Sequence, residues 1–221
     1  GIFESMCSLC TTFASIRQRK MEASTRLSPQ KSGEAVDATK TVVPSVLDTM
    51  QATAVRVAKD NAVSLITGFP GTGKTHVIQH MSRAFAETPS HSCGIGDVLV
   101  CAPTGKACAN LKERGIPART IHSVLFQASG AGAVMINATT LIVDEVSMVT
   151  AALLQSLLSV LPLLSRVVLV GDPDQLPPIE HGGVLSMLHG QIPGTALTHN
   201  YRDKTSARKL AHAAEKIRNS E

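Results

Sequence analysis

The amino-acid sequence predicts a three-layer α/β domain, in which a parallel β-sheet carries helices on both faces. Short runs rich in Val, Ile and Leu recur along the chain, and a longer stretch with helical periodicity separates most of them from the next. The runs are apolar on both faces, as strands buried inside a parallel sheet are. Strand, helix and strand in alternation is the repeating unit of such sheets.

The elements follow in order along the chain. The expected strands span residues 62–67, 98–102, 140–143, 166–170 and 195–198. The expected helices span residues 46–59, 75–87, 106–113, 151–161 and 205–218. Val46, Met50, Ala54 and Val57 fall on one face of the first helix, which makes it amphipathic. The leucine stripe of the 151–161 helix indicates core packing.

The chain divides into residues 1–45 and residues 46–221. Residues 22–45 are rich in Ser, Thr, Lys, Pro and Ala and have weak periodicity, so we predict that residues 1–45 are a poorly ordered tail and linker. Two other interpretations stay open: a targeting segment, given the basic residues at 17, 19 and 20, and lipid anchoring, because residues 1–5 fit a myristoylation pattern if a Met precedes Gly1. We predict one α/β lobe over residues 46–221, since 221 residues are too few for two such lobes.

Composition narrows the classes of protein. Hydrophobic residues make up 43% of the chain and charged residues 17%, which is ordinary for a soluble core. The net charge of +4 permits a polyanionic partner without singling one out. With one Tyr, five Phe and no Trp, stacking on several bases is disfavoured. Any nucleic-acid contact should therefore be mainly to the backbone.

The five cysteines are odd in number and scattered. This pattern indicates a reducing, intracellular compartment, cytoplasm or nucleus, rather than a disulfide framework. Cys7 and Cys10 form a lone C-x-x-C pair without a matching second pair, which disfavours a zinc site. The sequence contains no run of about 18 apolar residues, so we predict no transmembrane segment.

A glycine-rich segment follows the first expected strand and opens the next helix. It reads Gly68-Phe-Pro-Gly-Thr-Gly73-Lys74-Thr75 and matches G-x-x-x-x-G-K-[ST]. Glycines let consecutive amides point inward around phosphates, and the helix N-terminus adds its own amides and dipole. Lys74 supplies a positive charge for the β- and γ-phosphates, and the Thr75 hydroxyl is a ligand for Mg²⁺. We therefore predict phosphate binding by Gly68, Pro70, Gly71, Thr72, Gly73, Lys74 and Thr75.

Two carboxylates, Asp144 and Glu145, directly follow the apolar run Leu141-Ile-Val. Hydrolysis of a nucleoside triphosphate needs one group to hold the magnesium shell and another to orient and deprotonate water. Asp144 at the strand end suits the metal, and Glu145 suits the base. In isolation, the same pair could be two surface acids.

The expected strand at residues 166–170 runs into the segment Gly171-Asp-Pro-Asp-Gln175-Leu-Pro-Pro178. The glycine and the three prolines restrict the backbone and hold one polar side chain in place. Gln175 is a neutral donor and acceptor that can contact both a γ-phosphate and the attacking water. A structural loop is the alternative interpretation of this segment.

In this order the motifs resemble those of superfamily 1 helicases, and specifically the RecD-like branch, from about Leu47 to Ala213. The resemblance implies the first RecA-like lobe of a P-loop NTPase that uses ATP and Mg²⁺. The segment around Gln51 is similar to the Q-motif, which implies adenine recognition. Asn200-Tyr-Arg202 is similar to motif IV, which implies that Arg202 reaches the γ-phosphate; a surface salt bridge is the alternative. The family arrangement also implies a strand order. The strand before Gln175 should lie between the strand before Gly68 and the strand before Asp144.

Two further segments resemble strand-contact motifs. Val100-Cys-Ala-Pro-Thr-Gly-Lys-Ala107 is similar to motif Ia, and Thr120-Ile-His122 is similar to the motif after it. The resemblance implies contacts with the backbone of single-stranded DNA from Pro103, Thr104, Lys106, Thr120 and His122. Lys106 as a solvated charge and His122 as a structural histidine stay open.

The resemblance implies a motor lobe that translocates on single-stranded DNA, in the 5′-to-3′ direction, when joined to a second RecA-like lobe. We expect that lobe to belong to a longer parent chain, and we expect this chain alone to hydrolyse ATP slowly and to unwind nothing. A viral-type superfamily 1 RNA helicase lobe is one alternative, although Ala-Pro-Thr-Gly-Lys-Ala favours the DNA branch. A truncated, nucleotide-dependent binding module is another, which the intact Glu145 and Gln175 disfavour.

Overall fold

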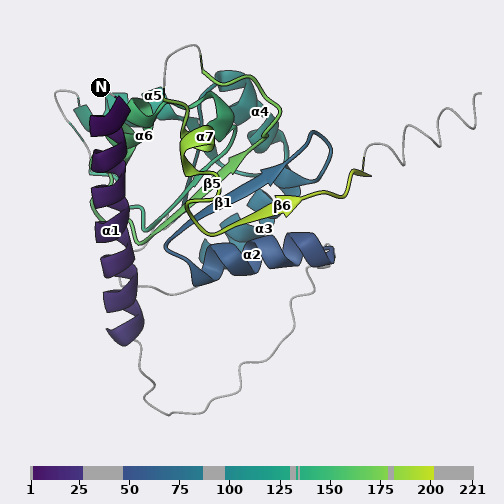
Figure 1. The fold of residues 1–221 in the computed structure, drawn as a ribbon, viewed down its shortest axis with the longest axis horizontal. Coiled ribbons are helices and arrows are strands. Elements are labelled where there is room, and N and C mark those ends of the chain that lie inside the picture. Colours follow the sequence, from purple (N-terminus) through teal and green to yellow (C-terminus); the bar gives the residue numbers. More distant parts are fainter. Residues whose placement is uncertain are drawn as a thin grey trace, which may run out of the picture.

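The computed structural model describes residues 2–26, 47–86, 98–129, 133, 135–178 and 182–201. In this part of the chain six strands form one sheet in the order β3-β2-β4-β5-β1-β6, and all neighbouring strands are parallel. The strands are β1 (Val63–Gly68), β2 (Val98–Ala102), β3 (Ala118–Thr120), β4 (Thr140–Val143), β5 (Arg166–Gly171) and β6 (Gly194–Leu197). The predicted α/β class and parallel sheet are confirmed, and Figure 1 shows the helices around the sheet.

Helices cover both faces of the sheet, as predicted. They are α1 (Ile2–Arg26), α2 (Thr49–Asp60), α3 (Lys74–Ala86), α4 (Gly105–Glu113), α5 (Ile121–Ser129), α6 (Ala151–Ser159) and α7 (Val184–Leu188), with a 3₁₀ turn η1 (Val146–Met148). Buried residues of α2, α3 and α4 join one core cluster, and those of α1, α5, α6 and α7 join the other. The expected bounds of the elements that were predicted shift by three residues at most.

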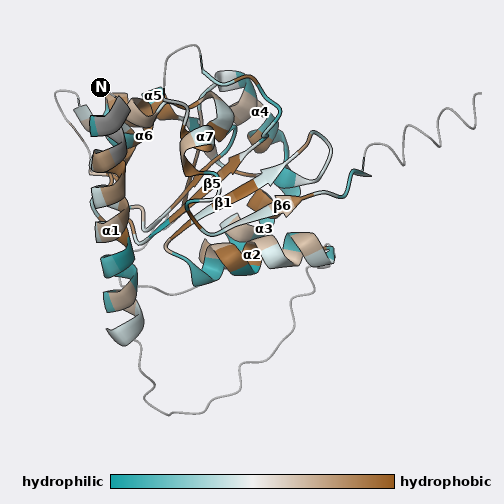
Figure 2. Cartoon of the chain, viewed as in Figure 1, coloured by the Kyte–Doolittle hydropathy of each residue, from teal (hydrophilic) through white to brown (hydrophobic). Residues whose placement is uncertain are grey.

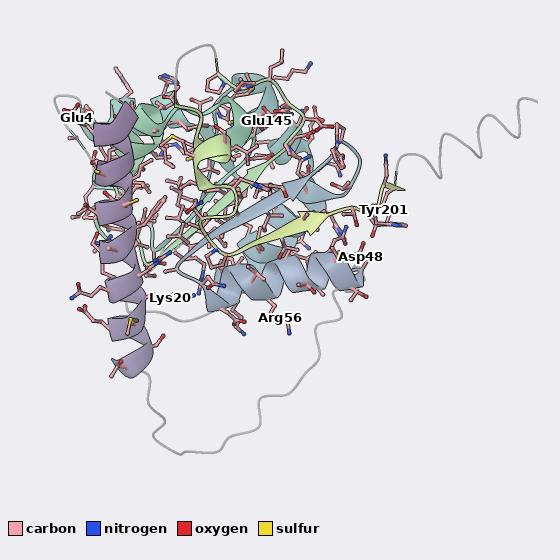
Figure 3. All side chains as sticks on the ribbon, in the orientation of Figure 1. Glu4, Lys20, Asp48, Arg56, Glu145 and Tyr201 are labelled. Atoms are coloured by element: carbon pink, nitrogen blue, oxygen red, sulfur yellow. The ribbon has the colours of Figure 1, made fainter. Side chains whose placement is uncertain are left out.

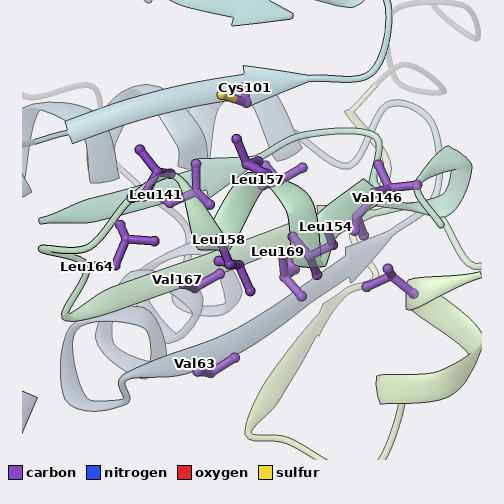
Figure 4. Packing of buried hydrophobic residues seen from close by; sticks show 14 of the residues in the cluster. Val63, Cys101, Leu141, Val146, Leu154, Leu157, Leu158, Leu164, Val167 and Leu169 are labelled. Atoms are coloured by element: carbon purple, nitrogen blue, oxygen red, sulfur yellow. The ribbon is translucent and has the colours of Figure 1, made fainter. Parts of the chain in front are cut away.

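Alternation along the strands builds the two cores. In β1, Leu65 belongs to the cluster under α6 and Ile66 belongs to the cluster under α3. Figure 4 shows the first cluster, in which Leu154, Leu157 and Leu158 of α6 pack over β4 and β5. In Figure 2 the central strands are mostly brown, whereas the helices carry teal, hydrophilic segments. The leucine stripe is therefore core packing, as predicted.

The N-terminal segment corrects one prediction. We predicted a poorly ordered tail over residues 1–45, but residues 2–26 form α1, which packs chiefly on α6. Leu9, Phe13 and Ile16 are buried at helical spacing on one face. Arg19 Nε donates to Leu164 O at 2.6 Å, and Lys20 Nζ donates to Lys59 O at 2.6 Å. Residues 22–26 of the expected linker belong to α1, and its residues 27–45 lie outside the described residues.

Besides α1, four elements were not predicted: β3, α5, η1 and α7. The expected helix at residues 205–218 lies outside the described residues, as does Arg202. No helix in the described part of the chain is long and apolar enough to cross a membrane.

Candidate functional site

The motif residues meet at the carboxyl edge of the sheet, in a cleft of about 570 Å³. Predicted residues of the phosphate loop line it, and α3 and the loops after β4 and β5 contribute Lys74, Thr75, Asp144, Glu145 and Gln175. Because β5 lies between β4 and β1, the expected strand arrangement is confirmed. Ligands of open parallel sheets bind at this edge.

The glycine-rich loop has the backbone that a phosphate cradle requires. Gly71 and Gly73 have φ angles of 89° and 84°, which favour glycine. A Cβ on Gly73 would lie 2.5 Å from Gln51 Nε2, so a larger residue there would require the Gln51 side chain to shift. The Thr72 hydroxyl donates to Phe69 O at 2.8 Å and closes the loop. The helix that follows begins at Lys74, so its first amides face the cleft.

Lys74 is held by its own loop. Its Nζ donates to Gly68 O at 2.5 Å and to Phe69 O at 3.2 Å, and it lies 3.8 Å from Asp172 Oδ2. Burial lowers the pKa of Lys74, whereas the neighbouring carboxylates of Asp172 and Asp144 oppose that shift. The ammonium group therefore sits at the cleft, held by two carbonyl groups of its own loop.

The acid pair ends β4 beside this loop. Asp144 N donates to Cys101 O at 2.8 Å, which ties it to β2. Glu145 N donates to Asp144 Oδ1 at 2.9 Å, and Glu145 adopts a left-handed backbone with φ 53°. It is the one non-glycine residue with positive φ among those described, and such strain is found preferentially at active sites. Burial raises the pKa of Asp144 to about 6, so a nearby cation would strongly favour its charged form.

The loop after β5 is anchored to η1. Ser147 Oγ donates to Gln175 Oε1 at 3.1 Å and accepts from Asp172 N at 3.2 Å. Asp172 is 2% exposed, and its Oδ1 accepts from Asp174 N at 3.0 Å. Gln175 itself is exposed at the mouth of the cleft.

Gln51 is placed differently from the cleft residues. It is 3% exposed and closes a capping box with Asp48 at the start of α2. Its Oε1 lies 3.4 Å from His76 Nδ1. Tyr201 N donates to Gly71 O at 2.9 Å, and the Tyr201 hydroxyl donates to Asp48, so both residues lie together at the end of α2 in Figure 3. Adenine recognition by Gln51 stays a prediction.

The predicted strand-contact residues form a second group at the same edge. β2 and β3 pair in parallel, with Ala102 opposite Thr120, so the segment from Pro103 to Lys106 lies beside the segment from Thr120 to His122. Thr104 caps α4, and the Thr120 hydroxyl accepts from Ser123 N at 3.2 Å. Lys106 and His122 are exposed, whereas Pro103, Thr104 and Thr120 are half-buried.

Sequence reasoning missed several residues around the cleft. Asp172 lies in the segment Gly171–Pro178 and Ser147 lies two residues after the acid pair, but their pairing depends on tertiary contacts. Asn110 of α4 and Arg114, the C-cap of that helix, also line the cleft, and their helical spacing of four was the available signal. Tyr201 was not predicted as a site residue, although it directly precedes Arg202.

The carboxylate content tests which metal the cleft fits. Among the described residues, no group of three or more His, Cys, Asp or Glu side chains is placed to hold a metal ion. Magnesium typically uses one or two protein ligands together with waters and substrate phosphates. Thr75 and Asp144 therefore fit Mg²⁺ that arrives with a phosphate ligand, and not a metal held by protein alone.

Together the parallel sheet, the phosphate loop and the acid pair define a RecA-like P-loop NTPase lobe. The chain belongs to the AAA domain family, whose model matches residues 46–221. α1 precedes the matched residues.

Relatives narrow the branch within this family. The chain is 42% identical over 143 residues to the ATP-dependent RecD2 DNA helicase of Deinococcus radiodurans, covering 62% of this chain and 19% of that protein. It is 32% identical over 163 residues to the RecBCD enzyme subunit RecD of Mycolicibacterium smegmatis, covering 62% and 29%. The resemblance to the RecD-like branch of superfamily 1 is thus confirmed. The chain spans less than a third of the length of these relatives.

Among solved structures, the Pif1 helicase from Candida albicans is similar, with a TM-score of 0.57 and 23% identity. The match covers 75% of this chain and 42% of that one. At this identity the likeness supports the fold alone.

Proposed function

We propose that the chain binds a magnesium–ATP complex in the cleft and hydrolyses it. We further propose that, joined to a second RecA-like lobe, it translocates along single-stranded DNA. One observation carries the proposal: three strand-end motifs from β1, β4 and β5 line a single cleft. The similarity to a relative named as an ATP-dependent DNA helicase supports ATP as the nucleotide and DNA as the nucleic acid.

Phosphate binding rests on the loop before α3. The positive φ angles of Gly71 and Gly73 turn successive amides inward. Lys74 exchanges its carbonyl partners for phosphate oxygens, which are stronger acceptors because they carry charge. Its neighbour Asp172 keeps the ammonium group at the cleft.

The acid pair divides two tasks. Asp144 and Thr75 would hold the magnesium ion, which when bound neutralises charge on the phosphate oxygens. Glu145 accepts a proton from the attacking water, and the exposed amide of Gln175 positions that water or a γ-phosphate oxygen. The left-handed backbone at Glu145 separates its direction from that of Asp144 while keeping the two carboxylates adjacent in sequence.

Isothermal titration with Mg²⁺ and ATP tests binding. We expect Lys74→Ala to abolish measurable affinity and Glu145→Gln to keep it while removing turnover. Lys59→Ala, on α2 away from the cleft, is the matched lysine control and should bind as wild type. Equal affinity of wild type and Lys74→Ala would refute the phosphate assignment.

Strand binding has its own reporter. The chain has no Trp, and Phe126 lies one helical turn beyond His122 with 83% of its surface exposed. Phe126→Trp therefore places a single fluorophore beside the proposed strand contacts. Titration with single-stranded DNA and RNA of matched sequence should change its emission, whereas Leu163→Trp, on a distant loop, should not respond. A response to RNA alone would favour the RNA helicase alternative, and no response to either strand would remove the motor proposal.

A further inference from the structure

The loop after β5 carries Gln175, whose amide is proposed to contact the γ-phosphate; we call Gln175 the sensor and this segment the sensor loop. The residue that orients Gln175 comes from the loop after β4. Ser147 lies in η1, is 2% exposed and was not among the predicted site residues. Its hydroxyl contacts two groups of the neighbouring loop: Asp172 N at 3.2 Å and Gln175 Oε1 at 3.1 Å. Ser147 thus connects the turn that carries the acid pair with the loop after β5.

Hydrogen-bond chemistry fixes the direction of both contacts. A serine hydroxyl has one hydrogen to donate and accepts through its lone pairs. The backbone amide of Asp172 can only donate, so it uses a lone pair of Ser147. The hydroxyl hydrogen is then directed to Gln175 Oε1, which leaves the Nε2 group of that side chain as the outward donor. Phosphate oxygens only accept, so this is the amide orientation that an anion requires.

The backbone allows this approach only because Gly171 ends β5. A Cβ at this position would lie 2.9 Å from Val146 Cγ1 and 3.4 Å from Ser147 Oγ. The same loop carries Asp172, whose side chain lies 3.8 Å from Lys74 Nζ. The buried hydroxyl of Ser147 therefore fixes the position of the sensor loop relative to the acid pair. Through Asp172, it also fixes that loop relative to the phosphate loop.

We propose that Ser147 is a positioning residue that presents the Nε2 donor of Gln175 to the cleft and so gives the site its preference for a triphosphate over a diphosphate. The inference rests on the proposed function, because it assumes that the cleft binds ATP. Ser147 itself touches no nucleotide. Its role is exerted through Gln175 and through the backbone of Asp172.

The test compares affinities for Mg²⁺ with an imido-bridged ATP analogue and with ADP, using the full chain. We expect Ser147→Ala to lower the triphosphate-to-diphosphate preference about tenfold, the scale of one hydrogen bond to a charged group, while ADP affinity stays within about twofold. Ser64→Ala is the matched control. Its hydroxyl is also fully buried but has no hydrogen-bond partner in the described structure, so its removal should leave the preference unchanged.

A double-variant cycle shows whether the effect runs through the sensor. If it does, Ser147→Ala in a Gln175→Ala background lowers the preference no further than Gln175→Ala alone. Should Ser147→Ala fail to fold, Ser147→Cys keeps similar volume with a weaker donor and takes its place.

The outcomes separate the two proposals. An unchanged preference in Ser147→Ala, additive losses in the cycle, or parallel loss of ADP affinity would each overturn the positioning role. A wild-type chain that binds both nucleotides but does not distinguish them would instead refute γ-phosphate sensing by Gln175, and absence of any nucleotide binding would refute the proposed function itself.

Discussion

Replacing Asp144, the half-buried acid that directly follows β4, should stabilise the nucleotide-free protein. Burial raises the pKa of Asp144 from 3.8 to about 6. A carboxyl with a raised folded-state pKa contributes stability that is fully present below about pH 4 and is lost as the pH rises through about 6. A shift of about two pKa units corresponds to about 3 kcal/mol.

Asp144→Asn mimics the protonated acid and keeps an acceptor for Glu145 N. We therefore expect the substitution to raise the free energy of unfolding by about 3 kcal/mol at pH 8 and by roughly half as much at pH 5. Urea denaturation followed by circular dichroism measures both values by linear extrapolation. Glu113→Gln, an exposed carboxyl on α4, should change stability little at either pH.

The stability advantage of Asp144→Asn over wild type should shrink when Mg²⁺ and ATP are present. Mg²⁺ with ATP stabilises a protein by mass action when it binds only the folded state, and Asn is a poorer ligand than a carboxylate for this ion. Wild type should therefore gain more from Mg²⁺ and ATP than Asp144→Asn does. A pH-independent stability difference, or a variant less stable than wild type at pH 8 without nucleotide, would refute the burial argument.

Three further changes test other parts of the molecule. Gly73→Ala should cost about 1–3 kcal/mol of unfolding free energy and weaken ATP binding in calorimetry, because Gly73 has a positive φ and its Cβ would be crowded. Gly115 also has a positive φ but has open space around its Cβ, so Gly115→Ala measures the cost of backbone strain alone. Phe13→Ala should cost about 3–5 kcal/mol in urea denaturation, and a cost near that of the exposed Met21→Ala would contradict the docking of α1. Lys106→Ala should weaken single-stranded DNA binding and lower the salt dependence of log K by about one, whereas an unchanged slope would remove it from the phosphate contacts.

The sheet was predictable because its strands are apolar on both faces and bounded by sharp turn signals. β3 was missed because it spans only three residues, Ala118–Thr120, two of which are half-buried. Its place is set by pairing with β2, which is a tertiary contact. α1 was missed because the polar residues between Leu9, Phe13 and Ile16 dilute the helical pattern, although the spacing itself was present in the sequence.

The site was predictable as far as each motif carries its own chemistry. Lys74, Asp144 and Gln175 could be named because their residue types follow buried strands. Ser147 could not be assigned a role, because a serine after an acid pair has no distinctive pattern. Its role appears only when β5 inserts between β4 and β1 and brings Asp172 against η1.

The order of the β-strands also bears on how ATP binding and single-stranded DNA binding are coupled in the proposed motor. The residues proposed to contact DNA follow β3 and β2, and the residues proposed to bind ATP follow β4, β5 and β1. The two sets of residues therefore occupy adjacent parts of one edge of the sheet. Asp144 N donates to Cys101 O, and the residues after Cys101 lead directly into the segment from Pro103 to Lys106. Buried parallel strands are too well packed to deform continuously. Any coupling between the two groups should therefore be carried by the loops at this edge, where Glu145 is strained and Gln175 is exposed, and not by movement within the sheet.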